Sequence, residues 1–385
     1  MSRLEELIQE LCPNGVEYKP LSDKTLFAFR YGKGNKIPED TGGQYDVYGA
    51  NGIVSHIDEY NCEDVTIIGH IGAVGLINRV KGKCFVTYNG TIATVVDKEK
   101  VDSQYLYYVL TTLNLPSRKK GSQPFLSVSD FDKIAIPVPP LEVQREIVRI
   151  LDSFTLLTAE LTAELTAELT ARKKQYQHYL NSFFENQTDN LVPLSSLGTI
   201  TRGKRFVHAD ATETGVPCIH YGELYTFYGV HANTVKSHIR EELRPKMRYA
   251  HKGDVIIVGA GENNIDIGVG VAWEGNEDVA VHDACYTLCH SQNSKYISFY
   301  LRSDMYHNQI KKYVSEGKVC SISATGLGKA MIPLPSITEQ ERIVSILDRF
   351  DSLCNDITTG LPAEIEARQK QYEFYRDKLL SFKQL

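Results

Sequence analysis

Basic and amide side chains gather in four short segments, where they could neutralise phosphates and read the edges of bases. Lys and Arg neutralise phosphates, Arg recognises guanine, and Asn or Gln recognises adenine in the major groove. The candidate DNA contacts are Arg30, Tyr31, Lys33, Asn35 and Lys36; Arg118, Lys119, Lys120 and Gln123; Arg202, Lys204 and Arg205; and Lys311 and Lys312. Any one such loop is more often a solvated turn. The first and third, however, follow the matching tripeptides at 20–22 and 193–195, which favours a role in binding DNA.

Signals for catalysis or metal binding are weaker. Gly259 and Gly261 follow an expected strand, but no third glycine opens a helix, so a dinucleotide-binding fold is not predicted. His70 has no accompanying nucleophile or carboxylate motif and reads as a structural histidine. One histidine and cysteine group has a spacing unlike that of paired zinc ligands and is better explained as strand core: His282, Cys285, Cys289 and His290. The chain is therefore predicted to be non-catalytic, with no metal or cofactor of its own.

A long internal repeat organises the sequence. Residues 136–179 return at 332–375 with a constant offset of 196, and roughly half of the positions are identical. Solenoid repeats run about 20–50 residues, so this period indicates a duplicated domain-plus-helix unit instead. Such a chain is pseudo-two-fold symmetric and could address two half-sites on a duplex or hold two copies of one partner.

Two long helices are predicted, over 141–183 and 337–381. Each carries an apolar stripe with helical spacing, and these stripes are candidate partner-binding surfaces: Ile147, Ile150, Leu151 and Phe154, and Ile343, Ile346, Leu347 and Phe350. Gly360 and Pro362 predict a kink or break in the second helix. Two such helices in one chain most simply pack as an antiparallel coiled coil.

The tetrapeptide Thr-Ala-Glu-Leu occurs three times in succession at 158–169. Its residues favour a helix, and each copy would lengthen that helix by about 6 Å. A low-complexity spacer between two domains is the simplest interpretation, and removing one copy should shorten that spacer.

The segments before the helices differ in character, with short runs of Val and Ile closed by glycine at 64–69 and 254–259. These predict buried strands. The expected fold class is α+β, with two α/β recognition domains separated by two long antiparallel helices that form a coiled coil. The expected boundaries are 1–135 for domain 1 with a short N-terminal helix, 136–185 for the first helical spacer, 186–331 for domain 2 and 332–385 for the second spacer.

Net charge, apolar runs and cysteine content bear on DNA binding and on the location of the protein. The net charge is −6, but residues 16–133 carry 14 basic and 14 acidic side chains, and residues 191–329 carry 15 and 14. A near-neutral domain can still bind DNA through a local basic patch. The N-terminus is charged, no apolar run reaches membrane-spanning length, and eight cysteines are scattered, so a cytoplasmic protein is predicted.

The repeated motif resembles a known family. Ile136-Pro137-Val138-Pro139, Gln144 and the segment 147–154 recur as Ile332-Pro333-Leu334-Pro335, Gln340 and 343–350, and each copy runs into a long helix. Over essentially its whole length the chain resembles the specificity subunit of type I restriction–modification systems. The tetrapeptide array resembles the spacer of one subclass, although the second helix has no such array.

The resemblance implies that each variable segment is a target recognition domain reading half of a split, asymmetric site in double-stranded DNA. The helices would set the spacing and recruit two methyltransferase subunits, which bind S-adenosylmethionine and flip out and methylate an adenine. A motor-nuclease subunit using ATP and Mg²⁺ would join for restriction. The alternatives are a fused enzyme, whose motifs are missing, and a coiled-coil scaffold or relic without active DNA recognition. The repeat also predicts that the C-terminus runs back to the start of the first domain.

Overall fold

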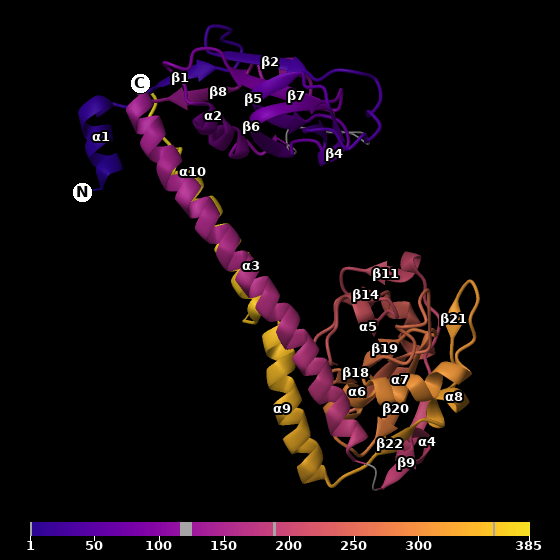
Figure 1. The fold of residues 1–385 in the computed structure, drawn as a ribbon. Helices are drawn as coiled ribbons and strands as arrows, with labels where there is room; N and C mark the ends of the chain where they lie inside the picture. Colours follow the sequence, from indigo (N-terminus) through magenta and orange to yellow (C-terminus); the bar gives the residue numbers. More distant parts are fainter. Residues whose placement is uncertain (1, 116–124, 188–189, 357–358) are drawn as a thin grey trace. The chain divides into compact units, whose positions relative to one another are not determined.

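In the computed structural model of the chain, the described residues are 2–115, 125–187, 190–356 and 359–385 (Figure 1). The chain divides into two compact units. The first unit comprises Met1–Thr162 and Ala367–Leu385, and the second comprises Ala163–Glu366. The helix α3 (Leu141–Glu185) runs without interruption from the first unit into the second, as the sequence predicted.

The first unit contains a six-stranded sheet with the order β2-β7-β5-β6-β3-β4 and a separate two-stranded ribbon of β1 and β8. The described elements of this unit before α3 are α1 (Arg3–Leu11), β1 (Glu17–Pro20), β2 (Phe27–Tyr31), β3 (Tyr45–Gly49), β4 (Gly52–Ile57), β5 (Cys62–Gly69), β6 (Ile77–Val86), β7 (Gly90–Val95), α2 (Ser103–Thr111), η2 (Val128–Asp130) and β8 (Ala135–Val138). The expected strand at 64–69 is part of β5, whose last five residues are buried.

The second unit contains two five-stranded sheets, β10-β20-β16-β18-β13 and β11-β14-β12-β19-β15, and a ribbon of β9 and β22. Its described elements from β9 to α6 are β9 (Leu191–Pro193), α4 (Leu194–Leu197), β10 (Gly198–Arg202), η3 (His208–Asp210), β11 (Ala211–Thr212), β12 (Val216–Ile219), α5 (Glu223–Thr226), β13 (His231–Ala232), β14 (Ser237–Ile239), η4 (Glu241–Lys246), β15 (Tyr249–Ala250), β16 (Val255–Val258), β17 (Ala260–Gly261), β18 (Gly270–Trp273), β19 (Val279–Val281), β20 (Cys285–His290) and α6 (Ser294–Tyr300). The remaining elements are α7 (Asp304–Ile310), η5 (Lys311–Tyr313), β21 (Cys320–Ser321), α8 (Ala324–Gly328), β22 (Met331–Pro333) and α9 (Ile337–Asn355), followed by α10 (Leu361–Leu379), which continues into the first unit.

The second long helix is broken where the sequence predicted. α9 ends at Asn355 and α10 begins at Leu361, and Pro362 lies in the first turn of α10, where a missing N–H is tolerated. A Cβ at Gly360 would lie 2.5 Å from the carbonyl oxygen of Ser352, so only glycine fits this close approach.

The ends of α3 are buried, whereas its middle is not. Val143, Ile147 and Leu151 belong to the core of the first unit, and Leu180 and Phe184 belong to the core of the second. Between residues 152 and 179, no side chain of α3 is buried. The tetrapeptide array at 158–169 therefore contributes helix length and no core.

Antiparallel helix pairing is repeated in both units (Figure 1). In the first unit, Phe154 of α3 stacks on Tyr375 of α10 with ring centroids 6.1 Å apart. In the second unit, Tyr179 of α3 contacts Phe350 of α9 at 5.1 Å. Adding 196 to Phe154 gives Phe350, and subtracting 196 from Tyr375 gives Tyr179, so both copies of the repeat make the same aromatic contact. The expected α+β fold with antiparallel helices is confirmed.

Candidate nucleic-acid interface

The basic segments at the ends of β2 and β10 are built on the same backbone scaffold. In the first unit, the N–H of Gly32 donates to Gly90 O at 2.9 Å, and the N–H of Lys33 donates to Val86 O at 2.9 Å. In the second unit, Gly203 donates to Cys285 O at 3.0 Å and Lys204 to Val281 O at 2.9 Å. Gly32 therefore corresponds to Gly203, and Lys33 to Lys204.

Glycine is required at both turns because the backbone at the end of β6 or β19 passes very close. A Cβ at Gly32 would lie 2.1 Å from the carbonyl oxygen of Thr87. A Cβ at Gly203 would lie 2.3 Å from the carbonyl oxygen of His282. The glycine holds the chain against the sheet, and the lysine that follows is exposed in each unit.

The predicted contacts in the first unit lie on the surface. Arg30 donates through an Nη to the carbonyl oxygen of Asn61 at 3.0 Å, which fixes its guanidinium beside β5. The hydroxyl of Tyr31 accepts from the N–H of Val128 at 3.1 Å. The other three predicted side chains of this segment are exposed: Lys33, Asn35 and Lys36. Arg118, Lys119, Lys120 and Gln123 lie outside the described residues.

The predicted contacts in the second unit form two groups. Arg202 donates through Nε to the carbonyl oxygen of Asp283 at 2.6 Å, and Lys204 and Arg205 are exposed beyond it. Lys311 and Lys312 are exposed on η5. The Lys312 ammonium lies 5.1 Å from the centroid of the Tyr313 ring, within the range of a cation–π contact.

Sequence reasoning included Tyr31 but missed that the rings of His70 and Phe125 lie beside it. The ring of Tyr31 lies 4.9 Å from that of His70, which in turn contacts Phe125 edge-on at 5.5 Å. Tyr31 and Phe125 are each 43% exposed. His70 is buried, and its Nδ1 lies 3.2 Å from the hydroxyl of Thr91, so it has the structural role that the sequence favoured. Burial also lowers the pKa of His70.

A histidine pair lies behind the basic segment of the second unit. The rings of His220 and His282 are 4.6 Å apart, and Phe206 contacts His282 edge-on at 4.9 Å. His282 accepts at Nδ1 from the N–H of Ala284 and lies with Nε2 3.1 Å from Phe206 O, which assigns its neutral Nε2–H tautomer. Burial lowers the pKa of both histidines, and their proximity lowers that of His282 further.

The eight predicted partner-binding side chains on the helices divide into two sets. Four are buried in the chain's own cores and so are not available to a partner: Ile147, Leu151, Ile343 and Leu347. The other four keep partial exposure: Ile150, Phe154, Ile346 and Phe350. In the first unit, Ile150 and Phe154 also line a groove of about 450 Å³ between α1, α3 and the C-terminal residues.

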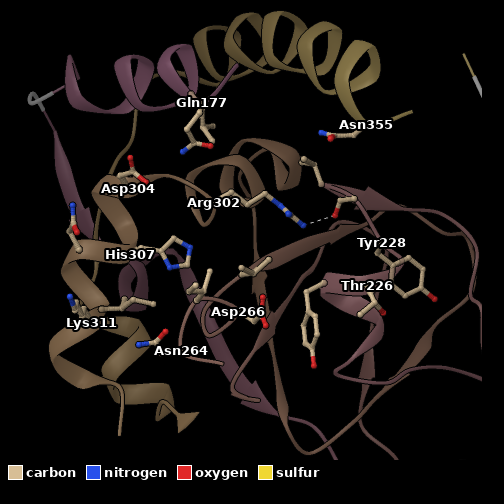
Figure 2. A pocket seen from close by; sticks show the side chains of 18 of the residues that line it. Gln177, Thr226, Tyr228, Asn264, Asp266, Arg302, Asp304, His307, Lys311 and Asn355 are labelled. Carbon is tan, nitrogen blue, oxygen red and sulfur yellow. Dashed lines mark hydrogen bonds between the residues drawn. The ribbon is translucent and has the colours of Figure 1, made fainter. Parts of the chain in front are cut away.

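A cavity of about 950 Å³ lies in the second unit and is lined in part by residues of α3, α5, α7 and α9. Figure 2 shows Gln177 and Asn355 over one side of it, with Arg302, His307 and the predicted contact Lys311 around it. Arg302 donates through an Nη to Gly229 O at 2.6 Å, and burial lowers its pKa. The mixture of acidic and basic side chains here does not match a phosphate site.

No metal-binding group is found within the described part of the chain, where no three His, Cys, Asp or Glu side chains gather closely enough to hold an ion. Among the described helices, none is long and apolar enough to cross a membrane. The eight cysteines are free thiols.

Comparison with known proteins agrees with this architecture. Residues 26–171 and 189–367 each match the Type I restriction modification DNA specificity domain. A type I restriction enzyme specificity subunit of Haemophilus influenzae is 33% identical over 393 residues, covering 98% of each chain. Another from Escherichia coli is 35% identical over 320 residues, covering 76% of this chain and 74% of its own. A solved chain from a study of the assembly of a type I system shares the fold, with a TM-score of 0.64, 16% identity and coverage of 96% and 98%.

The duplicated fold and the two matched domains define a DNA-specificity protein. The chain belongs to the type I restriction–modification DNA specificity family. It is a non-catalytic subunit whose role is to recognise DNA sequence.

Proposed function

We propose that each unit reads one half of a split, asymmetric site in double-stranded DNA. The observation that carries this proposal is the shared scaffold at Gly32 and Gly203, with the exposed basic residues that follow each glycine. Lys33, Lys204 and Arg205 contact phosphates, because exposed cations at matching strand ends suit a repeating backbone. Lys36, Lys311 and Lys312 extend these surfaces, and Arg30, Asn35 and Arg202 are placed beside them to read bases.

The domain boundaries follow from the repeat and belong to the same proposal. Residues 1–135 and 186–331 are the recognition domains, and residues 136–185 and 332–385 are the helical spacers. The uninterrupted α3, whose array at 158–169 is not buried, supports a role as a ruler that sets the distance between half-sites. On this proposal the chain belongs to the subclass with tetrapeptide spacer repeats, because three copies of the tetrapeptide stand in succession at 158–169.

The partners are two methyltransferase subunits, which bind through the partly exposed side chains of the helix pairs. Ile150 and Phe154 in the first unit match Ile346 and Phe350 in the second under the 196-residue offset, so one partner surface can bind twice. S-adenosylmethionine belongs to those partners, and a motor-nuclease subunit supplies ATP- and Mg²⁺-dependent restriction. The named relatives are specificity subunits of type I restriction enzymes, which supports this assembly. Free cysteines support a cytoplasmic location.

The test is to map methylated adenines across the genome in cells that express the chain with its cognate methyltransferase subunit. A split, asymmetric motif that appears only with the chain is the expected result. A complex that assembles but produces no chain-dependent motif would favour a scaffold or a relic. Binding of the assembled complex to the mapped site should also weaken steeply with salt, because counterions are released when phosphates are neutralised.

A further inference from the structure

The two units can be compared position by position around their glycine turns. Tyr31 pairs with Thr91 across β2 and β7, and Arg202 pairs with Tyr286 across β10 and β20. Because Gly32 corresponds to Gly203, Tyr31 occupies the place of Arg202, and Thr91 the place of Tyr286.

The next strand gives two more correspondences. The N–H of His70 donates to Asn89 O at 3.1 Å, and that of Gly259 donates to Ala284 O at 2.8 Å. The bridges Ile71–Phe125 and Ala260–Ser321 then follow one residue later. His70 therefore corresponds to Gly259, and Phe125 corresponds to Ser321. The last pair is separated by 196 residues, the offset of the sequence repeat.

Two residues in each unit form the floor of this position: His70 and Thr91 in the first unit, and Gly259 and Tyr286 in the second. The larger of the two side chains comes from the opposite position in the two units. In the first unit His70 is large and its neighbour Thr91 is small. In the second unit Gly259 faces the ring of Tyr286, and a Cβ on Gly259 would lie 2.4 Å from the Tyr286 Cε2. The Tyr286 ring thus takes the space of the missing side chain, and its hydroxyl donates to Ile322 O at 3.1 Å. The floor is filled in both units.

The residues on either side of this floor differ in chemistry between the two units. In the first unit, Tyr31 and Phe125 present an exposed aromatic surface on either side of His70. In the second unit, Arg202 and Ser321 stand in their places and line a hollow of about 300 Å³ together with Asp283, Ser315 and Ser323. The same backbone position therefore offers apolar contact in one unit and hydrogen-bonding groups in the other.

We propose that this position determines base specificity in each unit, and that Arg202 reads a guanine in the half-site of the second unit. The inference rests on the proposed function. The Nε of Arg202 is used by Asp283 O, while among the described residues its two Nη groups have no hydrogen-bond partner. A guanidinium held in this way can donate both Nη groups to the O6 and N7 of guanine. Tyr31 and Phe125 instead contact an apolar feature of the other half-site, such as a thymine methyl group.

The experiment uses the full chain assembled with its cognate methyltransferase subunit, with methylated-adenine mapping as the readout. Arg202→Ala is expected to reduce the preference for one guanine, in one half-site only, by about tenfold or more. Arg202→Lys keeps the charge but loses the planar fork, so it should relax the same base position. Tyr31→Ala should affect only the opposite half-site. Arg244→Ala is the matched control, because Arg244 is an exposed arginine of the same unit that pairs with Glu241 on η4.

Several outcomes would overturn the inference. An unchanged motif with Arg202→Ala would show that Arg202 reads no base. An equal loss of methylation at all sites, without a change in motif, would make it a phosphate contact. If thermal unfolding shows that Arg202→Ala is not folded, the motif methylated by Arg202→Lys decides instead, and an unchanged motif would overturn the inference. Failure of the proposed function is distinct, since the wild-type chain would then produce no motif.

Discussion

Gln144 and Gln340, which lie 196 residues apart, make corresponding hydrogen bonds in two different units. Gln144 accepts from the N–H of Asp102 at 2.9 Å and donates to Pro139 O at 2.7 Å. Gln340 accepts from the N–H of Asn293 at 3.1 Å and donates to Pro335 O at 2.9 Å. Both side chains are fully buried, and each joins the start of a long helix to the residue that caps the helix packed against it.

Replacing Gln144 by leucine should destabilise the first unit. The substitution removes the acceptor for Asp102 N–H and the donor for Lys100 O and Pro139 O, leaving buried polar groups without partners. We expect a loss of about 2–4 kcal/mol in the free energy of unfolding. Chemical denaturation followed by circular dichroism measures it. Gln369→Leu, on the exposed surface of α10, should change stability by less than about 0.5 kcal/mol. Equal effects of the two substitutions would contradict this role for Gln144.

The aromatic pairs between the helices should be energetically coupled to a similar extent in both units. Stacked or tilted aromatic pairs contribute about 0.5–1.5 kcal/mol beyond the burial of their surface. Double-mutant cycles to alanine should therefore give coupling of this order for Phe154 with Tyr375 and for Phe350 with Tyr179. Denaturant unfolding of the single and double variants measures these coupling energies. Coupling in only one pair would argue against equivalent helix packing.

The repeat was sufficient to predict the duplicated fold, the long helices and the break near Gly360. The duplication is visible as identity between two distant segments of the sequence, whereas the helices and the break depend on local signals, namely apolar periodicity and helix-breaking residues. The expected strand at 254–259 was also found, although β16 is shorter, at Val255–Val258. The broken second helix confirms that Pro362 and Gly360 outweigh the helical preference of their neighbours.

The candidate interface was less accessible from sequence, because it depends on pairing between distant strands. Nothing near Tyr31 in the sequence indicates that His70 and Phe125 lie beside it. Likewise, the correspondence of Gly259 with His70 becomes visible only through their hydrogen bonds to Ala284 and Asn89, the residues just before β20 and β7. The apolar stripes were recognised, but periodicity alone does not show that Ile147 and Ile343 face the chain's own cores while Phe154 remains partly exposed.

The stability of the second unit should fall as the solution is acidified. Burial lowers the folded-state pKa of His282, so the unfolded chain binds a proton at higher pH than the folded one does. The contribution is fully present above the ordinary pKa of about 6.5 and is lost as pH falls towards the lowered value, by at most about 1.4 kcal/mol per pH unit. His282→Gln should therefore flatten the dependence of unfolding free energy on pH between about 7 and 5.

A substitution of His251 serves as a control, because its expected effect on the pH dependence of stability is opposite to that of His282→Gln. Its hydrogen bond to Asp278 raises its pKa, so protonation of His251 stabilises the folded state at low pH, and this contribution is lost as pH rises through the raised value. His251→Gln should make the acid-induced loss of stability steeper. Denaturation series at several pH values test both variants, and a change in the same direction for both would contradict the assignment.

A circular permutant opened between Glu185 and Asn190 should fold. The prediction that the C-terminus returns to the start of the first domain is confirmed, because Val16 N–H donates to Lys383 O at 2.9 Å and Leu385 N–H donates to Val16 O at 3.1 Å. A flexible linker of about ten residues, spanning roughly 16–19 Å on average, would join the old ends past α1. Thermal unfolding should show a midpoint within a few degrees of the wild type. An insoluble permutant beside soluble wild type would contradict this prediction.

Deleting Thr166 to Leu169 should shorten the spacer of the recognised site without changing either half-site. The deletion removes one tetrapeptide from α3 where no side chain is buried, so both cores remain intact. It shortens the helix by about 6 Å, against about 3.4 Å for each base pair, and a spacer shorter by one or two base pairs is expected. Replacing the same four residues with Ala-Glu-Lys-Leu keeps the length and should leave the spacer unchanged. Mapping of methylated adenines reads both variants, and an unchanged spacer in the deletion variant would refute the ruler role of α3.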